Sequence, residues 1–191
     1  MPNVFLIADL HFGHQGVCKF LKDDGSKLRH YQNADEMDED MVQRWNSTVG
    51  AKDKVYVLGD VAMRRQSLSI IRRLNGDKVL IKGNHDIYKL NDYSEHFRDV
   101  RAYHVMNGLI LSHIPLHEES LGGYGCNIHG HLHYRQVMCG NENGKRVIDP
   151  RYFCVSVEQI DYTPIRFESV LARIREQGGH VGFKLGNAKA M

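Results

Sequence analysis

Five short apolar runs, each closed by glycine or a polar residue, do most to limit how this chain can fold. They are rich in Val, Ile and Leu, and runs of this length and composition are typical of buried β-strands. The runs are Asn3–Ala8, Val55–Gly59, Lys78–Gly83, Gly108–Ser112 and Cys126–Gly130. The sequence therefore predicts at least five strands.

Helical patterns separate and follow these runs. A first helix is predicted over 33–50, with Asn33 as its N-cap and Met37, Met41 and Trp45 along one face. Because strands and helices are mixed along the chain, we expect an α/β fold.

Two further helices complete the predicted order of elements. One is expected over Ser67–Gly76 and the last over about Phe167–Gln177. The glycine-rich residues 178–191 are expected to form a flexible tail. No internal repeat, low-complexity segment or linker interrupts the 191 residues, so we expect a single domain over 1–191.

Polar side chains follow all five apolar runs. They are Asp9 and His11 after the first run, Asp60 after the second, Asn84, His85 and Asp86 after the third, His113 after the fourth, and His131 and His133 after the fifth. The carboxyl ends of strands in an open α/β sheet share one edge, where ligands bind. A lone loop histidine is usually ordinary loop chemistry, but five coincident cases favour one assembled site.

The residue types in this set are those of a metal site. Carboxylate oxygen, amide oxygen and imidazole nitrogen bind divalent metals, and the absence of thiolates from the set excludes a structural zinc site of the cysteine type. Six or seven candidate ligands of these types are too many for one ion and about right for two. Two ions roughly 3.5–4 Å apart can hold a nucleophilic hydroxide and clamp a phosphoryl oxygen.

The same residues resemble the complete motif series of the calcineurin-like metallophosphoesterases. The motifs are Asp9-x-His11, Gly59-Asp60, Gly83-Asn84-His85-Asp86, His113 and Gly130-His131-x-His133. They stand in the family's order, with none missing. The resemblance implies a four-layer α-β-β-α sandwich in which two mixed sheets are flanked by helices.

The resemblance also implies a role for each residue. One metal would be held by Asp9, His11 and His133, the other by Asn84, His113 and His131, with Asp60 bridging the two. His85 would be a catalytic residue that does not bind metal, and Asp86 the acid that orients its ring. Two divalent ions are the implied cofactors, with Mn²⁺ favoured and Fe, Ni²⁺ or Zn²⁺ as alternatives. A metal-bridging hydroxide would attack phosphorus.

Three other residues are weaker predictions as substrate contacts. His14 follows the first ligands, Arg64 follows the Asp60 turn, and Arg29 lies in a polar insertion before the first helix. Each has an alternative as a capping, rim or surface residue. Cys154 stands where the small relatives often carry Asn, which we expect to bear on local substrate contacts.

The expected function is hydrolysis of a small phosphate monoester or diester by a metal-dependent phosphoesterase. A nuclease acting on DNA or RNA is the alternative within the enzymes, and a non-catalytic metal-binding scaffold is the alternative outside them. A net charge of +2 without a long basic stripe does not indicate nucleic-acid binding. A scaffold would typically have lost the catalytic histidine or several ligands, and all of them are present.

Cellular location follows from what the sequence lacks. No run approaches the roughly 18 apolar residues of a membrane span, and the first residues show no secretory leader. The four cysteines are scattered without a CxxC pair, which suits free thiols in a reducing compartment. We therefore expect a cytoplasmic protein without membrane contact; the oligomeric state stays open.

Overall fold

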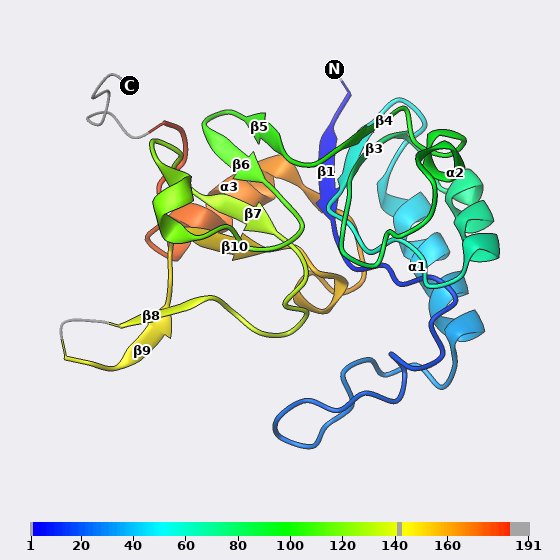
Figure 1. Cartoon of the computed structure of the whole chain (residues 1–191), viewed down its shortest axis with the longest axis horizontal. Helices are drawn as coiled ribbons and strands as arrows, with labels where there is room; N and C mark the ends of the chain where they lie inside the picture. Colours follow the sequence, from blue (N-terminus) through cyan, green and yellow to red (C-terminus); the bar gives the residue numbers. More distant parts are fainter. Residues whose placement is uncertain (1, 141–142, 184–191) are drawn as a thin grey trace.

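Two β-sheets form the centre of the structure, a computed structural model that describes residues 2–140 and 143–183 (Figure 1). The strand order is β11-β1-β2-β3-β4 in the larger sheet and β10-β7-β6-β5 in the smaller. The larger sheet contains β1 (Val4–Ile7), β2 (Lys54–Val57), β3 (Asp77–Ile81), β4 (Asp99–Arg101) and β11 (Ile165–Arg166). The smaller contains β5 (His104–Met106), β6 (Leu109–Leu111), β7 (Asn127–His129) and β10 (Tyr152–Cys154). A separate antiparallel pair is formed by β8 (Met138–Gly140) and β9 (Arg146–Ile148).

The strand directions gather the carboxyl ends of both sheets in one region. Strands β1 to β4 run parallel, and only β11 is antiparallel to its neighbour β1 in this sheet of described residues. In the smaller sheet, β7 runs parallel to β6 and β10, whereas β5 is antiparallel to β6. An isolated parallel bridge between Ala8 and Ser156 joins the two sheets just beyond β1 and β10. The loops after β1, β2, β3, β6 and β7 therefore open towards the same place.

The five predicted strands are confirmed as β1, β2, β3, β6 and β7, with slightly different ends. The other described strands have two or three residues each. None of these strands is buried along its whole length, whereas β6 and β7 are, so the unpredicted strands lack the continuous apolar run that marks a buried strand.

Helix α1 (Ala34–Thr48) confirms the first predicted helix together with its cap. The Asn33 Oδ1 atom accepts a hydrogen bond from the backbone N–H of Glu36 at 2.9 Å. The Glu36 carboxylate in turn accepts one from the backbone N–H of Gln32 at 2.8 Å. Both interactions satisfy N–H groups that would otherwise lack partners at the start of the helix.

The second predicted helix forms as a 3₁₀ helix, η1 (Arg65–Arg73), rather than as an α-helix. The apolar residues Leu68, Ile71 and Leu74 recur at every third position and are buried. That spacing suits a helix with three residues per turn. The last predicted helix is confirmed as α3 (Phe167–Glu176). The structure adds α2 (Leu90–Ser94), η2 (Glu118–Leu121) and η3 (Val157–Gln159), which were not predicted.

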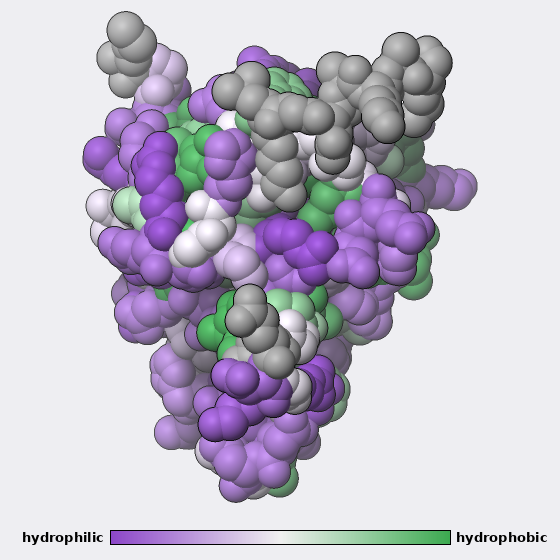
Figure 2. All heavy atoms as spheres, turned by 90° about the vertical axis from the view of Figure 1, so that its left-hand side faces the viewer, coloured by the Kyte–Doolittle hydropathy of each residue, from purple (hydrophilic) through white to green (hydrophobic). Residues whose placement is uncertain are grey.

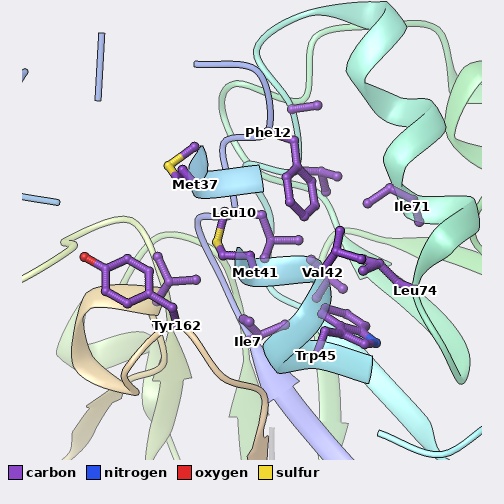
Figure 3. Packing of buried hydrophobic residues seen from close by; sticks show 14 of the residues in the cluster. Ile7, Leu10, Phe12, Met37, Met41, Val42, Trp45, Ile71, Leu74 and Tyr162 are labelled. Carbon is purple, nitrogen blue, oxygen red and sulfur yellow. The ribbon is translucent and has the colours of Figure 1, made fainter. Parts of the chain in front are cut away.

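Hydrophobic cores lie on both faces of the larger sheet. One face carries α1 and η1, where Trp45 and Ile71 belong to the same core as Ile7 (Figure 3). The other face meets the smaller sheet and α3 in a second core that includes Leu58 and Ile128. Helix η2 contributes to a third, smaller core on the outer face of the smaller sheet. The prediction of an α-β-β-α arrangement, with two mixed sheets flanked by helices, is confirmed.

The face that carries β8 and β9 is mostly hydrophilic, with small hydrophobic areas between polar ones (Figure 2). Within residues 2–140 and 143–183, no helix is both long and apolar enough to cross a membrane. Part of the predicted flexible tail is described, because Phe183 forms an isolated bridge with Tyr124. The rest of that prediction, residues 184–191, lies outside the described residues.

Candidate metal centre

The seven predicted ligands meet where five strands end. In each of two groups, the potential ligand atoms lie within 4.8 Å of one another. The first cluster consists of Asp9, His11 and His133. The second cluster consists of Asp60, His113 and His131, together with Asn84, whose Oδ1 lies 2.8 Å from His113 Nε2. The grouping agrees with the two ligand sets that the motif resemblance implies.

Asp60 lies between the two clusters. Its Oδ2 atom is 3.3 Å from His113 Nε2 in the second cluster and 3.6 Å from His11 Nε2 in the first. Burial alone would raise the pKa of Asp60, but the hydrogen bond and charge of His113 outweigh it and bring the pKa to about 2. An ionised carboxylate oxygen that faces both groups has the position that a bridging ligand needs.

Asp9 and His11 leave polar atoms without partners in the interior. Asp9 Oδ2 accepts hydrogen bonds from Ser156 Oγ at 2.6 Å and from the backbone N–H of His131 at 2.9 Å. Asp9 Oδ1 and both ring nitrogens of His11 are buried and have no hydrogen-bond partner among the described residues. Burial, and then the charge of Arg29, lower the pKa of His11 well below its ordinary value. A neutral imidazole and a free carboxylate oxygen are the groups that a cation would satisfy.

The buried side chains of Glu158 and Arg29 support His133. Its Nδ1 atom lies 3.0 Å from Glu158 Oε1, and Arg29 Nε donates to the same oxygen at 2.7 Å. The Glu158 side chain is 3% exposed, and burial would raise its pKa, yet the charges of Arg29 and His133 bring the pKa to about 2. The contact orients the ring so that Nε2 is left for a metal, as carboxylates commonly do behind metal-binding histidines.

The structure corrects the prediction that Arg29 contacts substrate. Arg29 is fully buried, and its guanidinium donates to the backbone carbonyls of Asp9 and Leu10 as well as to Glu158. The polar insertion folds back so that this side chain lies beneath the first cluster rather than at its rim. Arg29 therefore positions the backbone that carries Asp9.

Backbone groups hold the second cluster. His113 Nδ1 lies 2.7 Å from the carbonyl oxygen of Leu58, which orients Nε2 towards Asp60. Asp60 Oδ1 accepts a hydrogen bond from the backbone N–H of His85 at 2.9 Å. A Cβ at Gly83 would lie 2.3 Å from that same Oδ1 atom. The glycine of the Gly-Asn-His-Asp motif is therefore required by the close approach of the Asp60 carboxylate.

Five of the candidate ligands have a left-handed backbone conformation. Their φ angles are 60° for Asp9, 52° for His11, 55° for Asp60, 69° for His131 and 55° for His133. Non-glycine residues adopt such angles infrequently, and strained positions of this kind concentrate at functional sites. These five ligands follow β1, β2 and β7, so the shared conformation belongs to the turns after these three strands.

His85 and Asp86 differ in exposure and in contacts. His85 is exposed, and its ring centroid lies 5.6 Å from that of His11. Asp86 is buried and accepts hydrogen bonds from the backbone N–H groups of Gly83, Asp60 and Val61 at 2.8, 2.9 and 3.0 Å. No hydrogen bond joins Asp86 to the His85 ring in the described structure. The expected ring-orienting role is therefore replaced: Asp86 fixes the turn that carries Asp60.

His14 lies beside the first cluster, and Arg64 is an exposed residue after the Asp60 turn. The His14 ring is 5.6 Å from that of His11, and its Nδ1 atom has no partner among the described residues. Arg64 is exposed and forms no ion pair within the described part of the chain, whereas the neighbouring Arg65 pairs with Asp92. Their proposed contacts with substrate stay predictions.

Glu158 and Ser156 are site residues that the sequence did not reveal. Both follow β10, and the Ala8–Ser156 bridge carries this segment to the first cluster. Cys154 lies in the same segment, with its Sγ atom 3.1 Å from Ser156 Oγ. Because Cys154 is 4% exposed, the expectation that it bears directly on substrate contacts is corrected: it packs under the ligands. No local motif marks these residues.

Comparisons with known proteins find relatives in sequence and similar solved structures. No protein-family model matches the chain. The uncharacterized protein MJ1445 of Methanocaldococcus jannaschii is 30% identical over 184 residues, covering 92% of this chain and 93% of that protein. The gene 66 protein of Mycobacterium phage L5 is 33% identical over 93 residues, covering 45% of this chain and 41% of that protein. The solved structure of AQ665, a protein of unknown function from Aquifex aeolicus, has a TM-score of 0.70 at 21% identity, covering 91% and 100% of the two chains.

Proposed function

We propose that this chain, which belongs to the same family as the Methanocaldococcus jannaschii protein MJ1445, is a phosphoesterase that depends on two divalent metal ions. Asp60 carries the proposal, because one of its carboxylate oxygens lies 3.6 Å from a histidine nitrogen of the first cluster and 3.3 Å from one of the second. The motif series that resembles the calcineurin-like metallophosphoesterases supports the same function.

The residues present fit a pair of metals. The first ion would be held by Asp9, His11 and His133, the second by Asn84, His113 and His131, and Asp60 would be shared. Mixed nitrogen and oxygen ligands suit Mn²⁺, Fe, Ni²⁺ and Zn²⁺, and we favour Mn²⁺. When bound, two such ions supply charge to the phosphoryl oxygens and lower the pKa of water for attack.

The remaining groups of the site would handle the substrate. The imidazole of His85 is exposed beside the clusters and would donate a proton to the leaving oxygen of the ester. Arg64, which is exposed and without an ion pair among the described residues, would bind a phosphate oxygen together with His14. Asp86 would act indirectly, by holding the Asp60 turn through three backbone hydrogen bonds.

A reconstitution experiment tests this proposal. The full chain is stripped with a chelator, reloaded with Mn²⁺, Fe²⁺, Ni²⁺ or Zn²⁺, and analysed for bound metal and for hydrolysis. The substrates are phosphomonoesters, phosphodiesters, cyclic nucleotides and single-stranded nucleic acid. We expect about two ions per chain and metal-dependent turnover of small esters.

Other outcomes favour the alternatives. Preference for single-stranded nucleic acid over every small ester would favour a nuclease, and two bound ions without turnover of any substrate would favour a metal-binding scaffold. Equal turnover in stripped and reloaded protein would overturn the proposal.

A further inference from the structure

An apolar groove opens beside the candidate metal centre. It has a volume of about 370 Å³, and its lining includes His131 and His133, one predicted ligand from each cluster. One wall is formed by Phe20, Leu21 and Leu28, and the other includes Leu132 and Tyr134. Because His131 and His133 belong both to the clusters and to the groove lining, a phosphate held at the clusters would lie next to this groove.

The first wall exposes large apolar side chains next to polar ligands. Phe20 is 50% exposed and Leu21 is 63% exposed, although both have large apolar side chains. The Phe20 ring meets the His14 ring edge-on, with a centroid distance of 5.6 Å and an interplanar angle of 84°. Exposed apolar surface rimmed by polar groups commonly marks a ligand groove.

A hydrogen bond and an ion pair connect the two walls of the groove. The backbone N–H of Asp23 donates to the Tyr134 hydroxyl at 3.1 Å, and Arg135 pairs with the Asp23 carboxylate at 2.6 Å. The Arg135 guanidinium also lies 5.4 Å from the centroid of the Tyr134 ring. These contacts join the insertion that carries Phe20 to the segment that carries Tyr134.

The size and walls of the groove select one kind of occupant. Its volume is near the lower end of the range for small-molecule sites, which suits one ring system and not a length of polymer. Phe20 and Tyr134 offer aromatic faces, on which a planar ring gains stacking energy that a methyl or sugar group does not. The groove is therefore suited to the flat, largely apolar part of an ester.

We infer that the groove binds an aromatic ring on the substrate, either a nucleobase or a simple aryl group, on the ester that stays attached to phosphorus. This inference rests on the proposed phosphoesterase function and names its substrate class. During hydrolysis the oxygen of water bonds to phosphorus, the bond to the leaving group breaks, and the ring-bearing ester is retained in the groove.

Three diesters with the same leaving group test the inference. They are the 4-nitrophenyl phosphodiesters whose second ester is methyl, phenyl or 5′-thymidyl. Because 4-nitrophenolate departs in every case, differences in kcat/KM report the retained group alone. We expect the metal-loaded wild type to favour one or both ring-bearing esters over methyl by about tenfold, a loss that truncation of one stacking residue commonly causes. The phenyl and thymidyl arms distinguish an aryl group from a nucleobase.

Variants locate the effect. Phe20→Ala should lower kcat/KM for the favoured ring-bearing ester by about tenfold and leave the methyl ester within about twofold. Leu21→Ala should act in the same direction. Phe183→Ala is the matched control, because Phe183 is 62% exposed and does not line the groove. An equal loss on all three esters, or no loss in Phe20→Ala, would overturn the inference.

Binding separates this inference from the proposed function. Phenylphosphonate and methylphosphonate, which have no ester to hydrolyse, are titrated calorimetrically into wild type and Phe20→Ala. Tighter binding of the phenyl compound by about tenfold, lost in the variant, supports the groove even if no diester is turned over. Equal affinities for the two phosphonates, together with equal kcat/KM for the thymidyl and methyl diesters, would reject it even if hydrolysis is found.

Discussion

The two ligand clusters meet at Asp60 but are held in place by different means. The first cluster is supported by buried side chains: Ser156 donates to Asp9, and Glu158 contacts His133. The second is supported by the main chain, through the carbonyl of Leu58 and the N–H of His85. The first cluster therefore depends on side chains that are far from its ligands in the sequence. The second cluster depends mainly on backbone groups that follow strands β2 and β3.

This difference determines what a substitution can reach. A single change behind the first cluster can remove a support without touching a ligand. Behind the second cluster the carbonyl of Leu58 and the N–H of His85 belong to the main chain, and the side chain that holds the Asp60 turn, Asp86, lies within the Gly-Asn-His-Asp motif. The first cluster should therefore be the more sensitive to substitutions outside the motifs, and the predictions below test that asymmetry.

The largest effect is expected at the residue that both clusters share. Asp60→Asn keeps the shape of the side chain but removes the charge that faces both groups. We expect loss of at least one of two bound metals and loss of turnover to the detection limit, measured by elemental analysis and ester hydrolysis. Asp9→Asn should reduce binding at one site only.

Asp161→Asn is the control for this substitution. Asp161 also has a left-handed backbone, with a φ of 49°, and its side chain is 84% exposed and remote from the ligands. Retention of two metals and near-normal turnover by Asp60→Asn would remove Asp60 from the shared position and with it the link between the clusters.

The next effect concerns a residue assigned to neither cluster. His85→Ala should lower turnover by about 10²–10⁴-fold, the usual contribution of a positioned acid or base, while both metals stay bound. The loss should be smaller for a nitrophenyl ester than for an alkyl ester, because nitrophenolate needs little protonation. Metal content and rates on both esters are the measurements.

Two results would contradict this role of His85. Loss of a metal would make His85 a ligand. An equal loss of rate on both esters would make it a phosphate-binding group and not an acid.

A smaller effect should appear behind the first cluster. Glu158→Gln removes the carboxylate that contacts His133 and Arg29, so affinity for one of the two metals should fall by about 10–100-fold. The free energy of unfolding should also fall, by on the order of 3 kcal/mol, because the Arg29 charge stays buried. Metal titration and chemical denaturation measure the two effects. Exposed Glu168 supplies the control, Glu168→Gln, and an equal fall at both metal sites would contradict the asymmetry.

The smallest effect is a dependence of stability on pH. Asp38 of α1 accepts hydrogen bonds from the backbone N–H of Gly13, at 3.0 Å to its nearer oxygen, and so supports the loop after His11. Burial raises its pKa to about 7. Because this folded-state pKa exceeds the unfolded value of about 3.9, the group stabilises the wild type at low pH and that contribution is lost as pH rises to about 7.

Asp38→Asn tests this linkage. Asparagine does not ionise, so the variant should gain stability relative to wild type as the pH rises from 4.5 to 8. The gain in the free energy of unfolding should be on the order of 1–2 kcal/mol and should appear as an increase in the Tm of the variant relative to that of wild type. Asp35→Asn, on the exposed side of the same helix, should show no such trend. A difference in Tm that is the same at both pH values would reject the linkage.

The difference between the two clusters also explains which parts of the site could be predicted from the sequence. The ligands were predictable because each directly follows a short apolar run, and parallel strands bring such positions together. Arg29 was predicted to contact substrate because a charged residue in a polar segment is usually exposed. In the structure its side chain is fully buried, which the sequence does not indicate. Asp86 was misplaced because adjacency to His85 does not give the direction of either side chain.

Other features depended on contacts that no local pattern records. Glu158 lies 25 residues beyond its partner His133 and reaches it only through the pairing of the two sheets. The helical form of η1 could not be read either, since Leu68, Ile71 and Leu74 suit an α-helical face as well as a 3₁₀ turn. In each case the contacts of the residue depend on tertiary packing, which a local sequence pattern does not give.

The left-handed ligands also bear on how such a chain changes over generations. Each non-glycine residue held in that conformation costs on the order of 1 kcal/mol, and at Asp9, His11, Asp60, His131 and His133 a glycine would relieve it. If selection for activity were lost while selection for stability remained, substitutions of these ligands by residues that suit the backbone better would be favoured. A descendant that had lost these ligands would lack the proposed activity but would have a higher free energy of unfolding.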